Sequence, residues 1–158
     1  MKIYYREKSG GIEILRCFGI EGRVEIPGMI EDKLVVSAAP YAFSSHMEEK
    51  EELKNACLWE VSDGLGFGRE EHVLAGNDVE EIAFPHTLKE IGRYIFYGCG
   101  NLRKLEFSDS LMQIGCGAFT GCHALEKLTV HMRQGKKSGV KEMLGEMWQR
   151  IDVNFLYE

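Results

Sequence analysis

The stretch LKEIGRYIFYGCGNLRKLEFSDS (residues 88–110) is followed directly by LMQIGCGAFTGCHALEKLTV (residues 111–130), and the two align without a gap at a spacing of 23 residues. Nine positions carry identical or similar side chains: Leu88/Leu111, Ile91/Ile114, Gly92/Gly115, Phe96/Phe119, Gly98/Gly121, Cys99/Cys122, Leu102/Leu125, Leu105/Leu128 and Phe107/Val130. Self-similarity at a fixed period of about 20–50 residues is typical of repeat proteins. The sequence therefore predicts a solenoid in which each repeat forms one coil.

Each repeat contains a strand pattern and a return segment. In the pattern LxxLxF, formed by Leu102, Leu105 and Phe107, the apolar side chains point inward and the residues between them face water. The return segment IGxxxFxGC packs its Phe behind that strand, and its glycines allow tight corners. No single repeat can bury both parts, so neighbouring coils must stack into a parallel sheet with about 4.8 Å between strands.

The repeat continues upstream in weaker form. One step back of 23 residues places Val79, Ile82 and Phe84 in the strand positions. The same step places Val73 in the position of Phe96 in the return segment, and a second step places Trp59 in a strand. The first repeat is irregular, with residues 41–43 as its aromatic turn. Five strands are predicted in all, near Val24, Trp59, Ile82, Leu105 and Leu128.

These residues resemble the BspA-type leucine-rich repeat, whose units typically read V-x-x-I-G-x-x-A-F-x-x-C-x-x-L-x-x-I-x-I-P. The stretch IGCGAFTGC (residues 114–122) matches it best, and Ile26-Pro27 and Phe84-Pro85 supply the strand-ending proline. The resemblance covers about residues 24–130. It implies an α/β leucine-rich-repeat solenoid with a short parallel sheet and about five coils. It also implies a non-enzymatic scaffold for a protein partner, because members of this family are often bacterial surface proteins that bind host or microbial proteins.

The chain is expected to form one leucine-rich-repeat domain over residues 1–158, with a cap at each end because terminal repeats would otherwise expose apolar surface. Residues 1–23 form the N-terminal cap, a β-hairpin with Gly10 and Gly11 in its turn. Residues 24–130 hold the repeats. Within them, SSHMEEKEELKNAC has the spacing of a capping box, which predicts a helical insertion near residues 45–57.

Residues 131–158 form the C-terminal cap. Apolar residues recur there at helical spacing after Ser138, and we expect a helix that packs this stripe on the last repeat: Val140, Met143, Leu144, Met147, Trp148 and Ile151. The final segment DVNFLYE reads as a strand with no obvious pairing partner. An unpaired strand edge can pair with another chain, so the alternative function is a structural or regulatory segment of a larger chain that self-associates there.

Composition and charge exclude some classes of partner. The formal net charge is −6, and residues 44–81 hold eleven acids against three bases. This excess should repel nucleic acid and acidic membranes. No apolar run is long enough to span a bilayer, and no apolar leader follows the start MKIYYREKSGG. A cytoplasmic location is therefore expected, or the cell surface or outside of the cell if a leader was removed.

The cysteines give no sign of a metal, a cofactor or a nucleophile. There are five, an odd number unlike that of a disulfide framework. Cys99 and Cys122 recur at the repeat period, so we interpret them as small buried side chains that stack on each other. Zinc needs about four closely spaced ligands, and no CxxC pair is present. The sequence therefore predicts no cofactor and no enzyme.

The candidate binding surface is the water-facing side of the predicted strands. The residues beside the inward Leu positions should form two columns along the sheet, with His131 beyond them. The columns are Glu81, Lys104 and Lys127, and Ala83, Glu106 and Thr129. The alternative is that these residues only keep the sheet face solvated. As a binding surface, the columns carry mixed charge and no large aromatic residue, which predicts weak, electrostatically tuned recognition.

Overall fold

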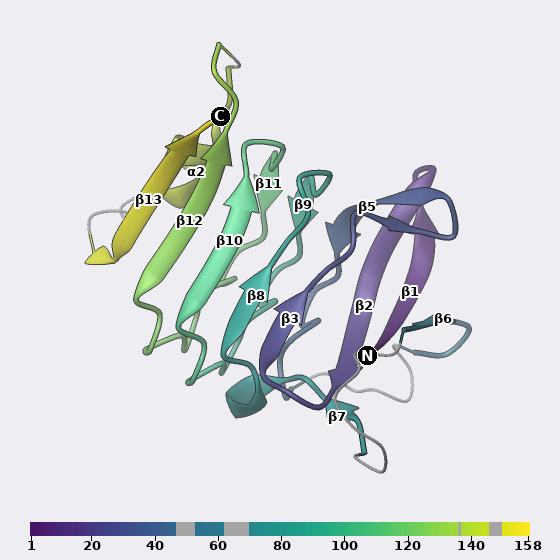
Figure 1. The fold of residues 1–158 in the computed structure, drawn as a ribbon. Helices are drawn as coiled ribbons and strands as arrows, with labels where there is room; N and C mark the ends of the chain where they lie inside the picture. The colour runs from purple at the N-terminus through teal and green to yellow at the C-terminus, as the bar shows by residue number, and fades with distance from the viewer. Residues whose placement is uncertain (47–52, 62–69, 136, 146–149) are drawn as a thin grey trace.

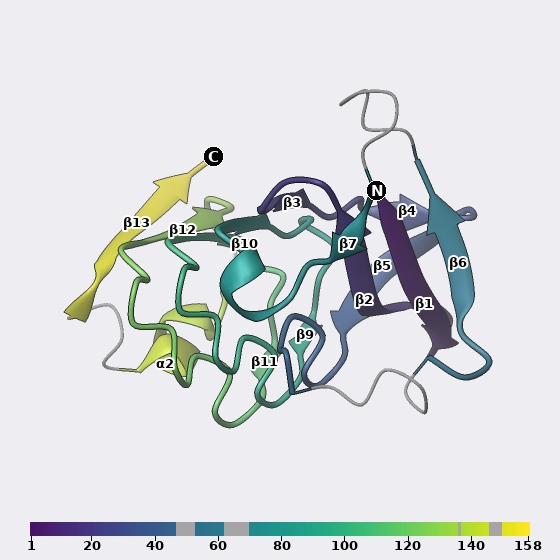
Figure 2. The same ribbon diagram turned by 90° about the horizontal axis from the view of Figure 1, so that it is seen from below.

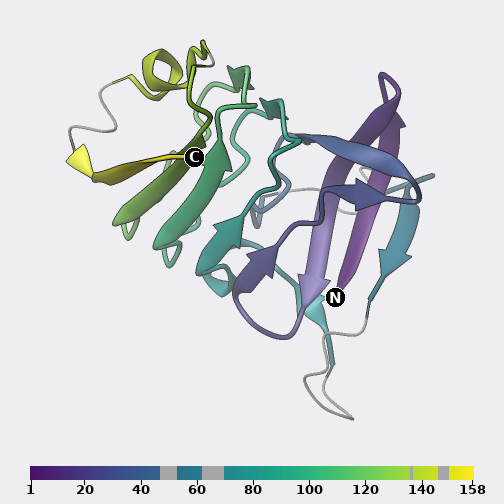
Figure 3. The ribbon, with the colours of Figure 1, turned by 45° about the horizontal axis from the view of Figure 1, so that its top comes forward.

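The computed structural model describes residues 1–46, 53–61, 70–135, 137–145 and 150–158. The fold is a mostly β solenoid of about five coils built on two sheets. A five-stranded sheet follows the chain order: β3 (Arg23–Glu25), β8 (Glu81–Ala83), β10 (Lys104–Ser108), β12 (Lys127–Met132) and β13 (Asp152–Tyr157). All four pairings in this sheet are parallel, and the strands lie side by side from β3 to β13 (Figure 1 and Figure 3).

The register of this sheet follows the repeat frame. Leu105 of β10 is opposite Ile82 and Leu128, and Val24 of β3 is opposite Ile82. These four side chains are buried, because each faces the interior of the solenoid where the next coil covers it. Lys104, one residue earlier, is exposed, as the alternation of side chains along a strand requires.

The second sheet has eight strands and covers the N-terminal end. Its main path is β11-β9-β5-β2-β1-β6, while β4 pairs with β5 and β7 pairs with β2. The strands are β1 (Lys2–Lys8), β2 (Gly11–Gly19), β4 (Met29–Ile30), β5 (Lys33–Ala38), β6 (Cys57–Glu60), β7 (His72–Val73), β9 (Glu90–Ile91) and β11 (Gln113–Ile114). The short strands β9 and β11 lie across the solenoid from β8, β10 and β12 (Figure 2). The return segments thus form a second parallel row, with β5, β9 and β11 in sequence.

Stacked phenylalanines fill the space between the two rows of strands. Phe43, Phe96 and Phe119 follow one another, with ring centroids 6.1 and 5.8 Å apart. Phe84 and Phe107 stack beside them at 5.4 Å. Phe43 and Phe96 are fully buried, whereas Phe119 is partly exposed near the C-terminal end. Each ring packs on its copy in the next coil, which is how the repeats stabilise one another.

Two predictions about the second repeat are wrong. Trp59 lies in β6, which pairs antiparallel with β1 and is not in the five-stranded sheet. Val73 lies in β7, opposite Phe18 of β2, and not in the stack of phenylalanines. The described parts of residues 44–73 therefore leave the repeat and add strands to the hairpin sheet, and β3 pairs directly with β8.

The buried Arg16 fixes the point where the chain leaves the repeat. Its Nη1 donates hydrogen bonds to the carbonyl oxygens of Tyr41, Ala42 and Ser44, at 3.0, 3.2 and 2.6 Å. A buried cation is tolerated only when polar groups surround it, and these carbonyls supply them. The chain returns at Gly76, whose N–H donates to the Phe43 carbonyl oxygen at 2.9 Å.

The N-terminal cap matches its prediction in outline. Strands β1 and β2 form an antiparallel hairpin. Its turn, however, uses Ser9 and Gly10, with φ of 52° and 80°, while Gly11 already begins β2. Of the helix predicted near residues 45–57, residues 47–52 lie outside the described part of the chain. The prediction is wrong for residues 53–57, because residues 53–55 form a turn and Cys57 begins β6.

At the C-terminal end, a short helix α2 (Val140–Leu144) begins close to the predicted position after Ser138 and buries Val140 and Leu144. Met147 and Trp148 lie outside the described residues. The segment DVNFLYE is β13, and it does have a partner: Val153 and Phe155 lie opposite Leu128 and Val130 of β12. The sequence missed this pairing because the spacing from β12 to β13 departs from the repeat period. Among the described residues, no helix is long and apolar enough to cross a membrane.

Candidate binding face on the five-stranded sheet

The structure places all six predicted surface residues on the outer side of three neighbouring strands. Glu81, Lys104 and Lys127 form one row across β8, β10 and β12. Ala83, Glu106 and Thr129 form the next row, and His131 lies beyond Thr129 on β12. The predicted columns and their order are therefore those observed.

Both columns extend further than the sequence frame indicated. Arg23 and Glu25 of β3 add to them beside β8, and Asp152 and Asn154 of β13 add to them beside β12. Arg23 and Glu25 could have been found from the sequence, because they flank Val24, which the repeat frame had already placed in a strand. Asp152 and Asn154 follow an irregular spacing, so no repeat frame predicts them.

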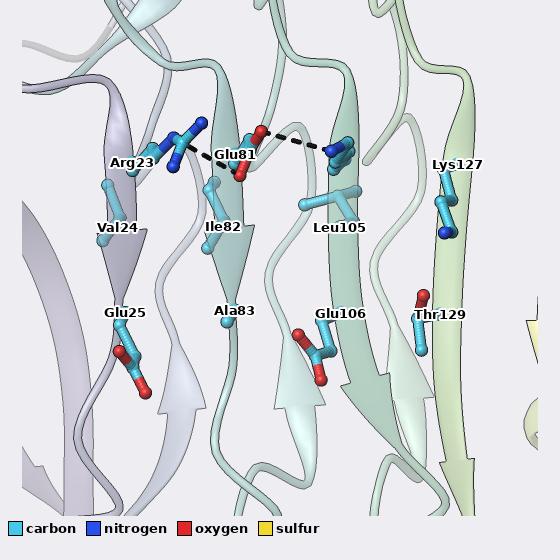
Figure 4. Close-up of a pocket in the computed structure, with 11 residues that line it drawn as sticks. Arg23, Val24, Glu25, Glu81, Ile82, Ala83, Leu105, Glu106, Lys127 and Thr129 are labelled. Carbon is cyan, nitrogen blue, oxygen red and sulfur yellow. Dashed lines mark ion pairs between the residues drawn. The ribbon is translucent and has the colours of Figure 1, made fainter. Parts of the chain in front are cut away.

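A shallow groove of about 390 Å³ lies over the first four strands of this face. Its polar lining carries charges of both signs: Arg23, Glu25, Glu81, Lys104, Glu106, Lys127 and Thr129. Figure 4 shows these side chains standing on the sheet above the buried row of Val24, Ile82 and Leu105. We name the outer side of the five-stranded sheet, with these residues, the ladder face.

Glu81 is the centre of the ion pairs on the ladder face. Its carboxylate lies 3.7 Å from Arg23 Nε and 3.6 Å from Lys104 Nζ (Figure 4). It also lies 3.8 Å from Arg103 Nη2. The three bases are 44–70% exposed, so water screens these pairs and each contributes little to stability. Lys127, on the next strand, has no ion pair within the described residues and is exposed. It is the cation most available to an acidic group from outside.

His131 joins the ladder face to the C-terminal end of the described chain. Its Nε2 contacts Glu106 Oε1 across β10 and β12, and its Nδ1 lies 2.7 Å from Glu158 Oε1. Burial alone would lower the pKa of His131, but hydrogen bonds to the two carboxylates outweigh it and raise the pKa above its usual value. The His86 ring lies 4.9 Å from the His131 ring. This corner therefore carries more positive charge as the pH falls.

The repeated cysteines lie inside the solenoid, away from the ladder face. The Cys99 thiol donates to the Phe43 carbonyl oxygen at 3.2 Å, and the Cys122 thiol donates to that of Phe96 at 3.3 Å. Burial raises the pKa of each thiol to about 12, so neither is a thiolate at neutral pH. Both hydrogen bonds link a return segment to the coil before it, which agrees with a structural role. No group of three or more His, Cys, Asp or Glu side chains that could hold a metal occurs in the described ranges.

Comparison with known proteins identifies the repeats. Residues 70–139 match the sequence model of a family described as "BspA type Leucine rich repeat region (6 copies)". These residues are similar to BspA-type leucine-rich repeats. The match includes β8, β10 and β12, which carry the six predicted residues of the ladder face. Strand β3 lies outside the match but pairs with the first of the BspA-type repeats.

One solved structure supports the same fold. A leucine-rich cell surface protein from Faecalibacterium prausnitzii A2-165 is 18% identical with a TM-score of 0.52, covering 82% of this chain and 31% of that one. The chain thus spans about a third of the length of that protein. A leucine-rich repeat protein from T. pallidum is 16% identical with a TM-score of 0.41, covering 98% of this chain and 79% of that one. No curated protein matches the sequence.

Proposed function

We propose that the chain is a non-enzymatic scaffold whose ladder face binds a protein partner. The observation that carries this proposal is the alignment of charged side chains from neighbouring coils on one open side of a rigid sheet. Stacked repeats create extended surfaces of this kind, and repeat proteins commonly use them for binding. The match of residues 70–139 to this repeat family supports the proposal, because leucine-rich repeats are typically non-enzymatic scaffolds for protein interactions.

The proposed contact residues are Glu81, Lys104, Glu106, Lys127, Thr129 and His131. They differ in how much of their charge is already engaged. Glu81 contacts three bases and Glu106 contacts His131, so a partner would have to compete for these carboxylates. Lys127 has no such competitor within the described residues. We therefore expect an acidic group of the partner to lie over Lys104 and Lys127.

The affinity through this face should be modest and sensitive to salt. Binding hot spots favour Trp, Tyr and Arg in desolvated pockets, whereas the groove on the ladder face contains one Arg and no aromatic side chain. Charged groups that stay near water act mainly on specificity and on the association rate. Raising the ionic strength should weaken binding because exposed charges are screened within about 8–10 Å.

The test is charge reversal on two surfaces. A partner would first be isolated by pull-down with the native chain. Lys104→Glu with Lys127→Glu should weaken its binding while the melting temperature stays nearly unchanged, because both side chains are exposed. Lys54→Glu with Lys89→Glu is the matched control, since it reverses two exposed lysines away from the ladder face. Loss of binding in the control but not in the ladder variant would place the interface elsewhere.

A second candidate function is self-association through β13. Within the described residues this strand pairs with β12 only, and Leu156 and Tyr157 on it are 39% and 56% exposed. An open strand edge with exposed apolar side chains favours pairing with another chain. Sedimentation velocity over a range of concentrations tests this candidate. The candidate would be contradicted if the chain stays monomeric at every concentration and its sedimentation coefficient is the same in Leu156→Lys.

A further inference from the structure

Four aromatic side chains line an open pocket of about 430 Å³ away from the ladder face. Its lining consists of Tyr41, His46, Tyr94 and Tyr97. Tyr41 follows β5, and Tyr94 and Tyr97 follow β9, so the pocket belongs to the return segments of the first two coils. Figure 2 shows β9 on the side of the solenoid opposite β10 and β12. We name this feature the aromatic pocket.

The rings of the aromatic pocket are fixed against one another at several angles. Tyr41 and Tyr94 are stacked, with centroids 5.6 Å apart and planes inclined by 20°. Tyr97 stands nearly perpendicular to Tyr94, at 5.8 Å and 82°. His46 in turn stands edge-on to Tyr97, at 4.7 Å and 72°. The four rings are thus held in fixed orientations, with Tyr97 at a steep angle to both Tyr94 and His46.

The backbone under this pocket adopts an unfavourable conformation to hold two of its tyrosines. Tyr41 and Tyr94 have φ of 59° and 51°. Gly117 occupies the same position of the next coil, with φ of 65°, and glycine is the residue that tolerates this conformation. A bulky side chain with positive φ is an outlier, and such strain concentrates at functional sites. The Tyr94 ring also covers Gly117, where a Cβ would lie 2.2 Å from its Cε1.

We propose that the aromatic pocket binds a quaternary ammonium group. The face of an aromatic ring carries negative electrostatic potential, and several faces around one cation are the arrangement by which proteins recognise choline and methylated lysine. Among the described residues, all of the side chains that line the pocket are aromatic, so this part of the lining offers ring faces and no carboxylate. This chemistry selects a weakly hydrated cation over a small, strongly hydrated one. The pocket is separate from the ladder face, so the two proposals stand or fall independently.

The experiment compares choline with its neutral carbon isostere, in which a tert-butyl group replaces the trimethylammonium group. Both ligands would be titrated into the whole chain and followed by NMR chemical shifts of the tyrosine rings. Choline should bind at least about fivefold more tightly than the isostere, because only the cation gains from the ring faces. Equal affinity of the two ligands, or no binding of choline, would overturn the proposal.

Variants locate the site and separate loss of binding from loss of folding. Tyr97→Leu should weaken choline binding by about fivefold or more, whereas Tyr97→Phe keeps the ring and should keep the affinity. Tyr94→Gly removes one ring from the pocket. The third coil already has a glycine, Gly117, at the equivalent position with positive φ, so the backbone conformation should be retained. Tyr157→Leu is the control for an exposed tyrosine elsewhere. Unchanged affinity in both Tyr97→Leu and Tyr94→Gly would contradict the assignment.

A second comparison distinguishes two sources of the same chemical group. A short peptide with one trimethyl-lysine would be titrated beside the same peptide with unmodified lysine. Tighter binding of the modified peptide than of choline supports a protein as the source, and tighter binding of choline supports a free small molecule. If the unmodified peptide binds as well as the modified one, the pocket does not recognise the quaternary ammonium group.

Discussion

The coils of residues 81–132 and the first coil of the solenoid use the same contacts but differ in their spacing along the chain. Ile82 and Leu105, on neighbouring strands, are 23 residues apart in sequence, whereas Val24 and Ile82, also on neighbouring strands, are 58 apart. The extra residues contain β6 and β7, which join the hairpin sheet. A coil is therefore defined by what it stacks on and not by the length of chain between two strands.

The contacts at the irregular junction are as complete as those within the regular coils. Phe43 N–H donates to the Ile95 carbonyl oxygen at 3.0 Å, and Phe96 N–H donates to that of Ala118 at 3.2 Å. The Cys99 thiol bonds to Phe43 just as the Cys122 thiol bonds to Phe96. The long insertion thus leaves the stacking of the first coil on the second unchanged. The following predictions test this equivalence.

The largest expected effect is the loss of a ring from the middle of the stack. Phe96 is fully buried between Phe43 and Phe119, and Phe96→Ala should lower the free energy of unfolding by about 3–5 kcal/mol through the cavity it leaves. Phe119→Ala should cost less, because that side chain is partly exposed. Chemical denaturation of both variants measures the difference. Equal and small losses would show that the stack does not hold the coils together.

Glycine substitutions test the two junctions directly. A Cβ on Gly92 would lie 2.3 Å from the backbone nitrogen of Pro40 in the first coil, and one on Gly115 would lie 2.2 Å from that of Arg93 in the second. Because backbone cannot move aside without separating the coils, Gly92→Ala and Gly115→Ala should each cost about 1–3 kcal/mol.

The control for these substitutions is Gly28→Ala, whose added Cβ would meet no atom closer than 3.7 Å and which should change stability by no more than about 0.5 kcal/mol. Similar losses for Gly92→Ala and Gly115→Ala would confirm that the irregular junction is packed as closely as the regular one. A neutral Gly92→Ala beside a costly Gly115→Ala would mean that the first coil stacks more loosely than the structure shows.

The sequence predicts the regular coils well because their contacts repeat in the sequence itself. Leu105 and Leu128, or Phe96 and Phe119, are copies that touch, so one period gives both the strand register and the rows of the ladder face. The same reasoning fails for Trp59 and Val73, whose partners lie in β1 and β2 and share no repeat with them. Similarly, nothing in the repeat pattern places Tyr41 beside Tyr94, because the two are separated by the insertion.

The smallest expected effect concerns the pH dependence of stability. Glu106 and Glu158 raise the pKa of His131 in the folded chain, so protonation favours folding. This contribution is fully present below the unfolded pKa of about 6.5 and is lost as the pH rises through the folded value. It should amount to less than about 1 kcal/mol, because both carboxylates are exposed to water.

Comparing the stability of His131→Gln with that of the native chain at several pH values measures the contribution of protonated His131. The difference in melting temperature between the native chain and the variant should shrink as the pH is raised from below the unfolded pKa to above the folded one. A difference that grows over the same range would mean that the neutral imidazole is the form stabilised by Glu106 and Glu158.

Lysine footprinting of the complex tests the proposed ladder face most directly. The chain would be acylated with and without the partner recovered by pull-down, and each lysine would be quantified by mass spectrometry. Lys104 and Lys127 should lose reactivity in the complex, while Lys54 and Lys89 keep theirs, because only the first pair stands on the ladder face. Protection of Lys54 or Lys89 with Lys104 and Lys127 unchanged would contradict the proposal that the regular coils bind the partner through this face.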